Sequence, residues 1–148
     1  MSEEPVVVRE ATLRDLPDMM SVFRRGYARE PKPAMMRELI ERFPCAVALN
    51  DNKISGFAYS RQATPGALEL LNLLVLTEMR DCGIGTKLLS LTERTASQLG
   101  YETLVLYVSL FYGVAGSKRS PVPFYTANGF QVQAISSSEF FCWKSLSN

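Results

Sequence analysis

The fold is decided by residues 67–110, ALELLNLLVLTEMRDCGIGTKLLSLTERTASQLGYETLVLYVSL. Residues 67–76 are almost continuously apolar and predict a strand buried on both faces, although this pattern alone also allows a helix. From Ile84 to Leu99 apolar and small residues recur every three or four positions, which indicates one face of a helix, and the glycine that follows is a natural stop. Residues 103–110 predict a second buried strand. The stretch has the size and order of a strand–helix–strand crossover with parallel strands.

Shorter elements are predicted before this crossover. Residues 5–9 are β-branched and predict a strand, and a helix start signal follows at residues 12–15. A second helix is expected over residues 34–42, where prolines lie on both sides. Strands at 45–49 and 54–61 are joined by a polar turn, which predicts a hairpin.

The residues after the crossover complete one domain. Residues 112–123 are rich in Gly, Ser and Pro and predict a loop, 124–128 predict a helical turn, and 130–144 predict two strands that close the sheet. The apolar segment 140–143 is expected to be a buried strand rather than an interface. Since no repeat or linker divides the 148 residues, we expect a single domain over residues 1–148.

Composition and charge exclude several classes of function. Sixteen Lys and Arg against fifteen Asp and Glu give a net charge of +1, without the basic excess typical of nucleic-acid-binding proteins. The chain has no histidine, which excludes Ser-His-Asp and Cys-His catalysis and imidazole metal sites. We therefore expect no nucleic-acid partner and no bound metal.

The cysteines and apolar segments indicate the compartment. The three cysteines are an odd number without CxxC spacing, which favours reduced thiols over a disulfide framework. The first residues, MSEEPVVVRE, lack the layout of a signal peptide. The longest apolar stretch, residues 103–115, is shorter than the ~20 residues that span a bilayer. We expect a soluble, cytoplasmic protein without a membrane partner.

A glycine-rich loop, RDCGIGTK at residues 80–87, joins the first buried strand to the helix. Backbone N–H groups at a helix start form a partially positive cradle, glycines let a phosphate approach closely, and Arg80 adds a positive charge. A dinucleotide fingerprint would need glycine at Leu88, and a Walker A loop would need Gly-Lys-Ser/Thr. The loop therefore predicts a pyrophosphate site, with a plain tight turn as the alternative.

Two motifs, in this order, resemble the GNAT superfamily of N-acetyltransferases. Residues 75–85, VLTEMRDCGIG, are similar to its coenzyme A signature R-x-x-G-x-G, and residues 124–130, FYTANGF, resemble its later F-Y-x-x-x-G-F motif. Residues 8–15 are similar to its first strand and turn, so the resemblance covers nearly the whole chain. It implies an α+β fold in three αβα layers, with a mixed, largely antiparallel sheet of six to seven strands, about four helices and two splayed central strands.

The resemblance implies how acetyl-CoA, the expected co-substrate, would bind. Its pantetheine arm would pair with the first splayed strand at Leu73, Leu74 and Val75, like an added strand. An N–H near Val75 would polarise the thioester carbonyl. The pyrophosphate would be held by Arg80 and by the loop residues that follow it: Asp81, Cys82, Gly83, Ile84, Gly85 and Thr86.

The resemblance also implies direct attack of a primary amine on the thioester in a ternary complex. Tyr125 matches the family's acid for the departing thiolate, with packing over the cofactor as the alternative role. Some members carry a glutamate base on the second splayed strand, but here that position is Tyr107. Glu69, on the first splayed strand, is the expected replacement, unless it lies at a strand end in solvent. Asn72 and Tyr107 are expected to satisfy polar groups of the core.

The chain departs from the family pattern before the F-Y pair. Lys118 and Pro121 stand where an asparagine and an alanine are usual, and the connection is longer. Lys118 and Arg119 are expected to be solvated, with a contact to a CoA phosphate as the alternative. Two other functions stay open: a non-catalytic acyl-CoA-binding or regulatory module, and an unrelated phosphate binder. The expected partner is an amine-bearing acceptor, a small molecule or a protein amine, and the expected assembly is a monomer or a homodimer.

Overall fold

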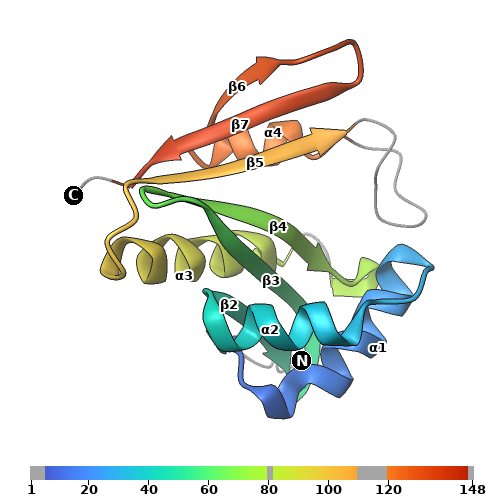
Figure 1. The fold of residues 1–148 in the computed structure, drawn as a ribbon. Helices are drawn as coiled ribbons and strands as arrows, with labels where there is room; N and C mark the ends of the chain where they lie inside the picture. The colour runs from blue at the N-terminus through green and yellow to red at the C-terminus, as the bar shows by residue number, and fades with distance from the viewer. Residues whose placement is uncertain (1–5, 80–81, 110–119, 147–148) are drawn as a thin grey trace.

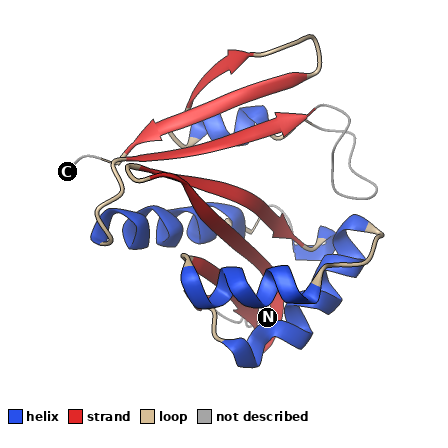
Figure 2. Cartoon of the chain, viewed as in Figure 1, coloured by secondary structure: helices blue, strands red, loops and turns tan. Residues whose placement is uncertain are grey.

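A computed structural model describes residues 6–79, 82–109 and 120–146, which form one sheet with helices on both faces (Figures 1 and 2). Within these residues the sheet has seven strands: β1 (Val7–Glu10), β2 (Cys45–Asn50), β3 (Lys53–Thr64), β4 (Ala67–Val75), β5 (Thr103–Ser109), β6 (Gln131–Ala134) and β7 (Glu139–Ser145). The helices are η1 (Leu13–Asp15), α1 (Leu16–Tyr27), α2 (Pro33–Arg42), η2 (Thr77–Met79), α3 (Ile84–Gln98) and α4 (Val122–Ala127).

The strand order is β1-β2-β3-β4-β5-β7-β6, and all neighbours are antiparallel except β4 and β5. The parallel pair is the predicted crossover, with α3 as its helix. A mixed, largely antiparallel sheet between helical layers is therefore confirmed.

Two hydrophobic cores lie on opposite faces of the sheet. One packs α3 and α4 against the sheet through residues such as Leu68, Leu88, Leu104 and Tyr125. The other, under α1 and α2, contains residues such as Met19, Met36, Phe57 and Leu74. Strand β4 contributes to both, which explains its nearly continuous apolar sequence.

The β2–β3 hairpin forms as predicted, because Asp51 and Asn52 both take left-handed backbone conformations, with φ of 53° and 61°. Strand β3 runs three residues beyond its predicted end. Its last four residues are exposed and mostly polar, but they pair with the start of β4, as in Arg61 opposite Glu69. Backbone pairing extends this strand where hydrophobicity gives no signal.

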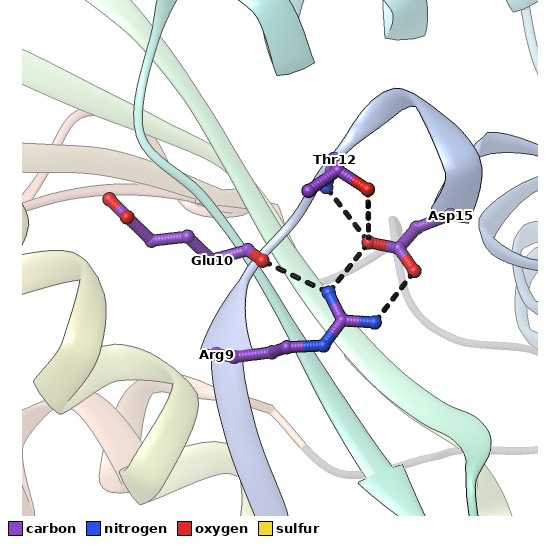
Figure 3. Close-up of polar contacts among 4 residues, drawn as sticks. All are labelled: Arg9, Glu10, Thr12 and Asp15. Carbon is purple, nitrogen blue, oxygen red and sulfur yellow. Dashed lines mark hydrogen bonds and ion pairs between the residues drawn. The ribbon is translucent and has the colours of Figure 1, made fainter.

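The start of α1 is fixed to β1 by a buried carboxylate (Figure 3). Asp15 accepts two hydrogen bonds from the Arg9 guanidinium, at 2.8 and 2.9 Å, and one from the Thr12 backbone N–H at 2.8 Å. These bonds lower the pKa of Asp15, chiefly through Arg9. They also stabilise the start of the helix, which the sequence predicted at residues 12–15.

Strands β4 and β5 separate after a short paired segment. They pair in three rows only, from Ala67–Thr103 to Glu69–Val105, after which β4 continues with β3 and β5 with β7. A bulge at Leu71 follows, because Asn72 opposes Tyr59 while Leu70 opposes Ser60. Figure 1 shows the two strands diverging toward their C-terminal ends. We call the space between them the splay, and it confirms the predicted splayed strands.

Candidate active site

The splay lies along the part of β4 that contains Leu73, Leu74 and Val75, the residues expected to pair with the pantetheine arm. The Leu74 side chain is fully buried under α1, and Gly26 of α1 lies so close that a Cβ there would stand 2.6 Å from Leu74 Cδ1. Leu73 and Val75 pack toward the opposite core. With these side chains fixed, this stretch of β4 presents its main chain toward the splay.

The glycine loop leads from β4 into α3, and Arg80 and Asp81 lie outside the described residues. Gly83 is the N-cap of α3, with φ of 76°, and no side chain caps the first turn. A Cβ at Gly83 would meet nothing within 4 Å. Cys82 and Thr86 are exposed, whereas Ile84 is buried in the core. The loop thus offers backbone N–H groups at an open helix start, which fits a phosphate group.

Gly85, in the first turn of α3, contacts the first residue of the F-Y pair. A Cβ at Gly85 would stand 3.2 Å from Cζ of Phe124 and 3.9 Å from Cγ2 of Val75. Helix α4 therefore reaches across the splay to the start of α3. The two sequence motifs, about 40 residues apart, meet in space here, as two parts of one site must.

Tyr125 lies behind Phe124, with only 7% of its surface exposed. Its ring packs edge-on against Phe124 and Phe130, at centroid distances of 5.1 and 5.5 Å. Burial raises the pKa of Tyr125, and the nearby Cys142 thiol raises it further. The phenol is therefore neutral at physiological pH and can donate a hydrogen bond.

Two further tyrosines, Tyr27 and Tyr59, belong to the core on the opposite face of the sheet. Asn72 donates a 2.6 Å hydrogen bond to the Tyr59 hydroxyl, and burial raises the pKa of Tyr59 to about 12. Burial also raises the pKa of Tyr27, and the hydroxyls of Tyr59 and Tyr125 raise it further. Tyr27 belongs to α1 and Tyr125 to α4, on opposite faces of the sheet.

Sequence reasoning missed Tyr27 and Tyr59, since neither belongs to a recognisable motif. Asn72 does serve a polar partner, as expected. The expectation for Tyr107 was wrong: its side chain is 61% exposed, because Leu106 and Val108 take the inward positions of β5.

Glu69 occupies the last row in which β4 and β5 pair, immediately before the bulge. Its side chain is 17% exposed and forms an ion pair with Arg61, at 3.7 Å. Because Leu68 and Leu70 face α3, Glu69 faces the side on which α1 and α2 lie. The structure thus places Glu69 at the apex of the splay, on the same face as Tyr59 and Asn72.

The remaining candidates lie outside this arrangement. Lys118 and Arg119 fall outside the described residues, and Pro121 is the N-cap of α4. The part of the chain that the structure describes contains no group of Cys, Asp and Glu suited to a metal ion. It also contains no helix long and apolar enough to cross a membrane.

The sequence model described as Acetyltransferase (GNAT) domain matches residues 41–132. This range includes β3, β4, α3, β5 and α4, and therefore the whole splay. The chain belongs to the GNAT family of acetyltransferases. No protein of curated function matches its sequence.

Solved structures confirm the fold over nearly the whole chain. Ard1 from Thermoplasma volcanium is 16% identical with a TM-score of 0.80, and the match covers 97% of this chain and 99% of that one. PaiA N-acetyltransferase from Thermoplasma acidophilum, solved in complex with coenzyme A, is 22% identical with a TM-score of 0.78 and coverages of 95% and 99%. The ribosomal-protein-S18-alanine N-acetyltransferase from Escherichia coli is 18% identical, with a TM-score of 0.78 and coverages of 97% and 96%.

Proposed function

We propose that this protein is an acetyl-CoA-dependent N-acetyltransferase that promotes direct attack of a primary amine on the thioester in a ternary complex. The observation that carries the proposal is the divergence of β4 and β5 beyond the Glu69–Val105 row. The open start of α3 contacts Phe124, whose neighbour in the chain is the buried Tyr125. The solved relative that contains coenzyme A supports the choice of co-substrate.

The chain would hold acetyl-CoA mainly through its backbone. Leu73, Leu74 and Val75 would pair with the pantetheine amides as an edge strand pairs with a peptide. An N–H near Val75 would hydrogen-bond the thioester oxygen and draw electron density from the carbonyl. The pyrophosphate would be held by N–H groups of the loop from Asp81 to Thr86, together with Arg80.

Tyr125 would donate its phenolic proton to the sulfur of the departing thiolate. Its raised pKa keeps the proton in place at neutral pH, and its neighbours Phe124 and Phe130 hold the ring. Because the ring is packed, donation needs little loss of side-chain entropy at the moment of reaction.

Glu69 would accept the proton of the attacking ammonium, through water where the two are not in direct contact. Its place at the apex of the splay supports this role.

One observation favours a second candidate, a non-catalytic acyl-CoA-binding module. Arg61 already engages the carboxylate of Glu69, and the second splayed strand carries Tyr107 where some family members have a glutamate. Such a protein would bind acyl-CoA but release no CoA in the presence of amines.

Calorimetric titration with acetyl-CoA and with desulfo-CoA tests the proposal first. Micromolar or tighter binding of both is expected, followed by amine-dependent CoA release in a panel of primary amines. Binding without release of CoA for any amine would favour the module. No binding of either ligand would overturn the proposal.

A further inference from the structure

Three aromatic side chains form a continuous surface on β5 and β7, which we call the aromatic face: Tyr107, Phe141 and Trp143. The rings of Tyr107 and Phe141 are 5.2 Å apart, and those of Phe141 and Trp143 are stacked at 5.4 Å with an interplanar angle of 18°. Tyr107 is 61% exposed and the other two are partly exposed. Residues 140–143 were expected to form a buried strand, but only Cys142 is buried.

The aromatic face lies on the side of the sheet opposite to α3 and α4. Leu106 and Cys142 point into the core under these helices, so the residues that alternate with them point away from it. On this side, α1 packs on β3 and β4, and α2 packs on β3. The aromatic face therefore lies beside the helical layer, with the splay between them.

Strand register connects the aromatic face to Glu69. Glu69 opposes Val105 on β5, and Val105 opposes Trp143 on β7. Opposed residues share a face of the sheet, and strands lie about 4.8 Å apart, so Trp143 stands about 10 Å from Glu69. The next row pairs Tyr107 with Phe141 and lies beside the splay.

We propose that the aromatic face binds an aromatic ring of the acceptor, and that the substrates are amines joined to such a ring by a short aliphatic linker. This inference rests on the proposed function, in which the amine is deprotonated beside Glu69. The neighbours of the three rings within these rows are the uncharged Val105, Gln131 and Gln133. A planar apolar group can stack on these rings. The row beyond Tyr107 and Phe141 pairs Ser109 with Glu139, whose carboxylate borders the aromatic face on β7.

Trp143 supplies a direct readout, because it is the only tryptophan of the chain. The experiment titrates 2-phenylethylamine and propylamine into the protein with and without desulfo-CoA, following Trp143 emission. Saturable change is expected with 2-phenylethylamine at a concentration about tenfold lower than with propylamine, since an aromatic pair adds up to about a factor of ten beyond its buried area. In a CoA-release assay, kcat/KM is expected to favour 2-phenylethylamine by a similar factor.

Tyr107→Ala and Phe141→Leu are the test variants. Each is expected to raise the KM for 2-phenylethylamine about three- to tenfold while leaving turnover of propylamine unchanged. Leu99→Ala is the matched control, because Leu99 is 63% exposed and is the C-cap of α3, at the end of that helix opposite to the glycine loop. Thermal unfolding of each variant verifies that the fold is kept.

The outcomes separate this inference from the proposed function. Turnover that is equal for both amines and insensitive to Tyr107→Ala would overturn the inference and leave the transferase intact. If the protein binds 2-phenylethylamine in a way that depends on Tyr107 but binds no acetyl-CoA, the aromatic site is supported and the proposed transferase function is overturned. The inference would also be overturned if Trp143 emission changed with protein concentration and Tyr107→Ala abolished a dimer. The aromatic face would then be an interface with a second copy of the chain.

Discussion

The ring of Phe124 lies directly over Gly85, so that a Cβ at residue 85 would come within 3.2 and 3.3 Å of two ring carbons. The contact joins α4 to the start of α3 across the splay. It also distinguishes the two glycines of the loop. Gly83 is required by its own backbone, at φ of 76° and with open space around it, whereas Gly85 is required by its neighbour.

Gly85→Ala is expected to displace Phe124 and weaken acetyl-CoA binding with little change in stability. Crowding between the new Cβ and the Phe124 ring lowers the free energy of unfolding by about 1–3 kcal/mol. The higher helix propensity of alanine raises it by about 1 kcal/mol. Calorimetry and urea unfolding measure the two effects. Adding Phe124→Leu should relieve the crowding at residue 85, and Gly83→Ala should instead lose about 1–2 kcal/mol of stability through backbone strain. Unchanged acetyl-CoA affinity in Gly85→Ala would show that the position of Phe124 does not matter for binding.

Tyr125→Phe is expected to lower kcat about a hundredfold, within the usual range for removal of a general acid, with acetyl-CoA affinity nearly unchanged. The ring and its packing stay, and only the proton donor is lost. Steady-state kinetics and calorimetry measure the two quantities. Tyr101→Phe is the control, because the Tyr101 hydroxyl hydrogen-bonds Gln62 on the surface. If kcat is equally high in both variants, Tyr125 is not the acid.

Glu69→Gln is expected to lower kcat about a hundredfold, as measured by steady-state kinetics with a primary amine. The loss follows because the amide cannot accept the ammonium proton. Arg61→Gln should keep Glu69 in place and retain most of the activity, since their ion pair is long, at 3.7 Å, and Arg61 is largely exposed. A kcat in Glu69→Gln equal to that of the wild type would exclude Glu69 as the base.

Asp15→Asn is expected to lower the free energy of unfolding by about 1–2 kcal/mol at neutral pH, through loss of charge-assisted bonds to Arg9 and Thr12. The folded-state pKa of Asp15 lies below its unfolded value of about 3.9. The stabilisation is therefore complete above that pH and is lost as the pH falls through the folded-state pKa.

Urea unfolding between pH 7 and pH 3 should accordingly show the two proteins converge in acid. Asp18→Asn provides the control, since Asp18 is exposed on the same helix. A difference between wild type and Asp15→Asn that persists unchanged at pH 3 would contradict this linkage.

The sequence predicted the elements whose signal is local. The periodicity after Ile84, the polar hairpin turn and the paired motifs placed α3, the β2–β3 hairpin and the splay correctly. The predicted binding and catalytic roles of the site residues stay predictions.

What the sequence did not predict depends on contacts between distant residues. Tyr107 was misplaced because a strand pattern does not say which of two alternating sets faces the core until both neighbours are known. The hydrogen bond of Asn72 to Tyr59 depends on the register of two neighbouring strands, which no local pattern encodes. The end of β3 follows backbone pairing alone.

The sheet consists of two parts, which are connected through the three paired rows between β4 and β5. On one side are β1 to β4, and on the other are β5, β6, β7 and α4, tied back by side-chain contacts such as the 2.7 Å ion pair of Lys144 with Glu93 of α3. Amide protons of the second part should therefore exchange through a lower-energy opening than those of β3. A ligand that bridges the splay at a hundred times its Kd would add about 2.7 kcal/mol against that opening. The lifetime of the folded chain in the presence of proteases would then rise and fall with the supply of that ligand.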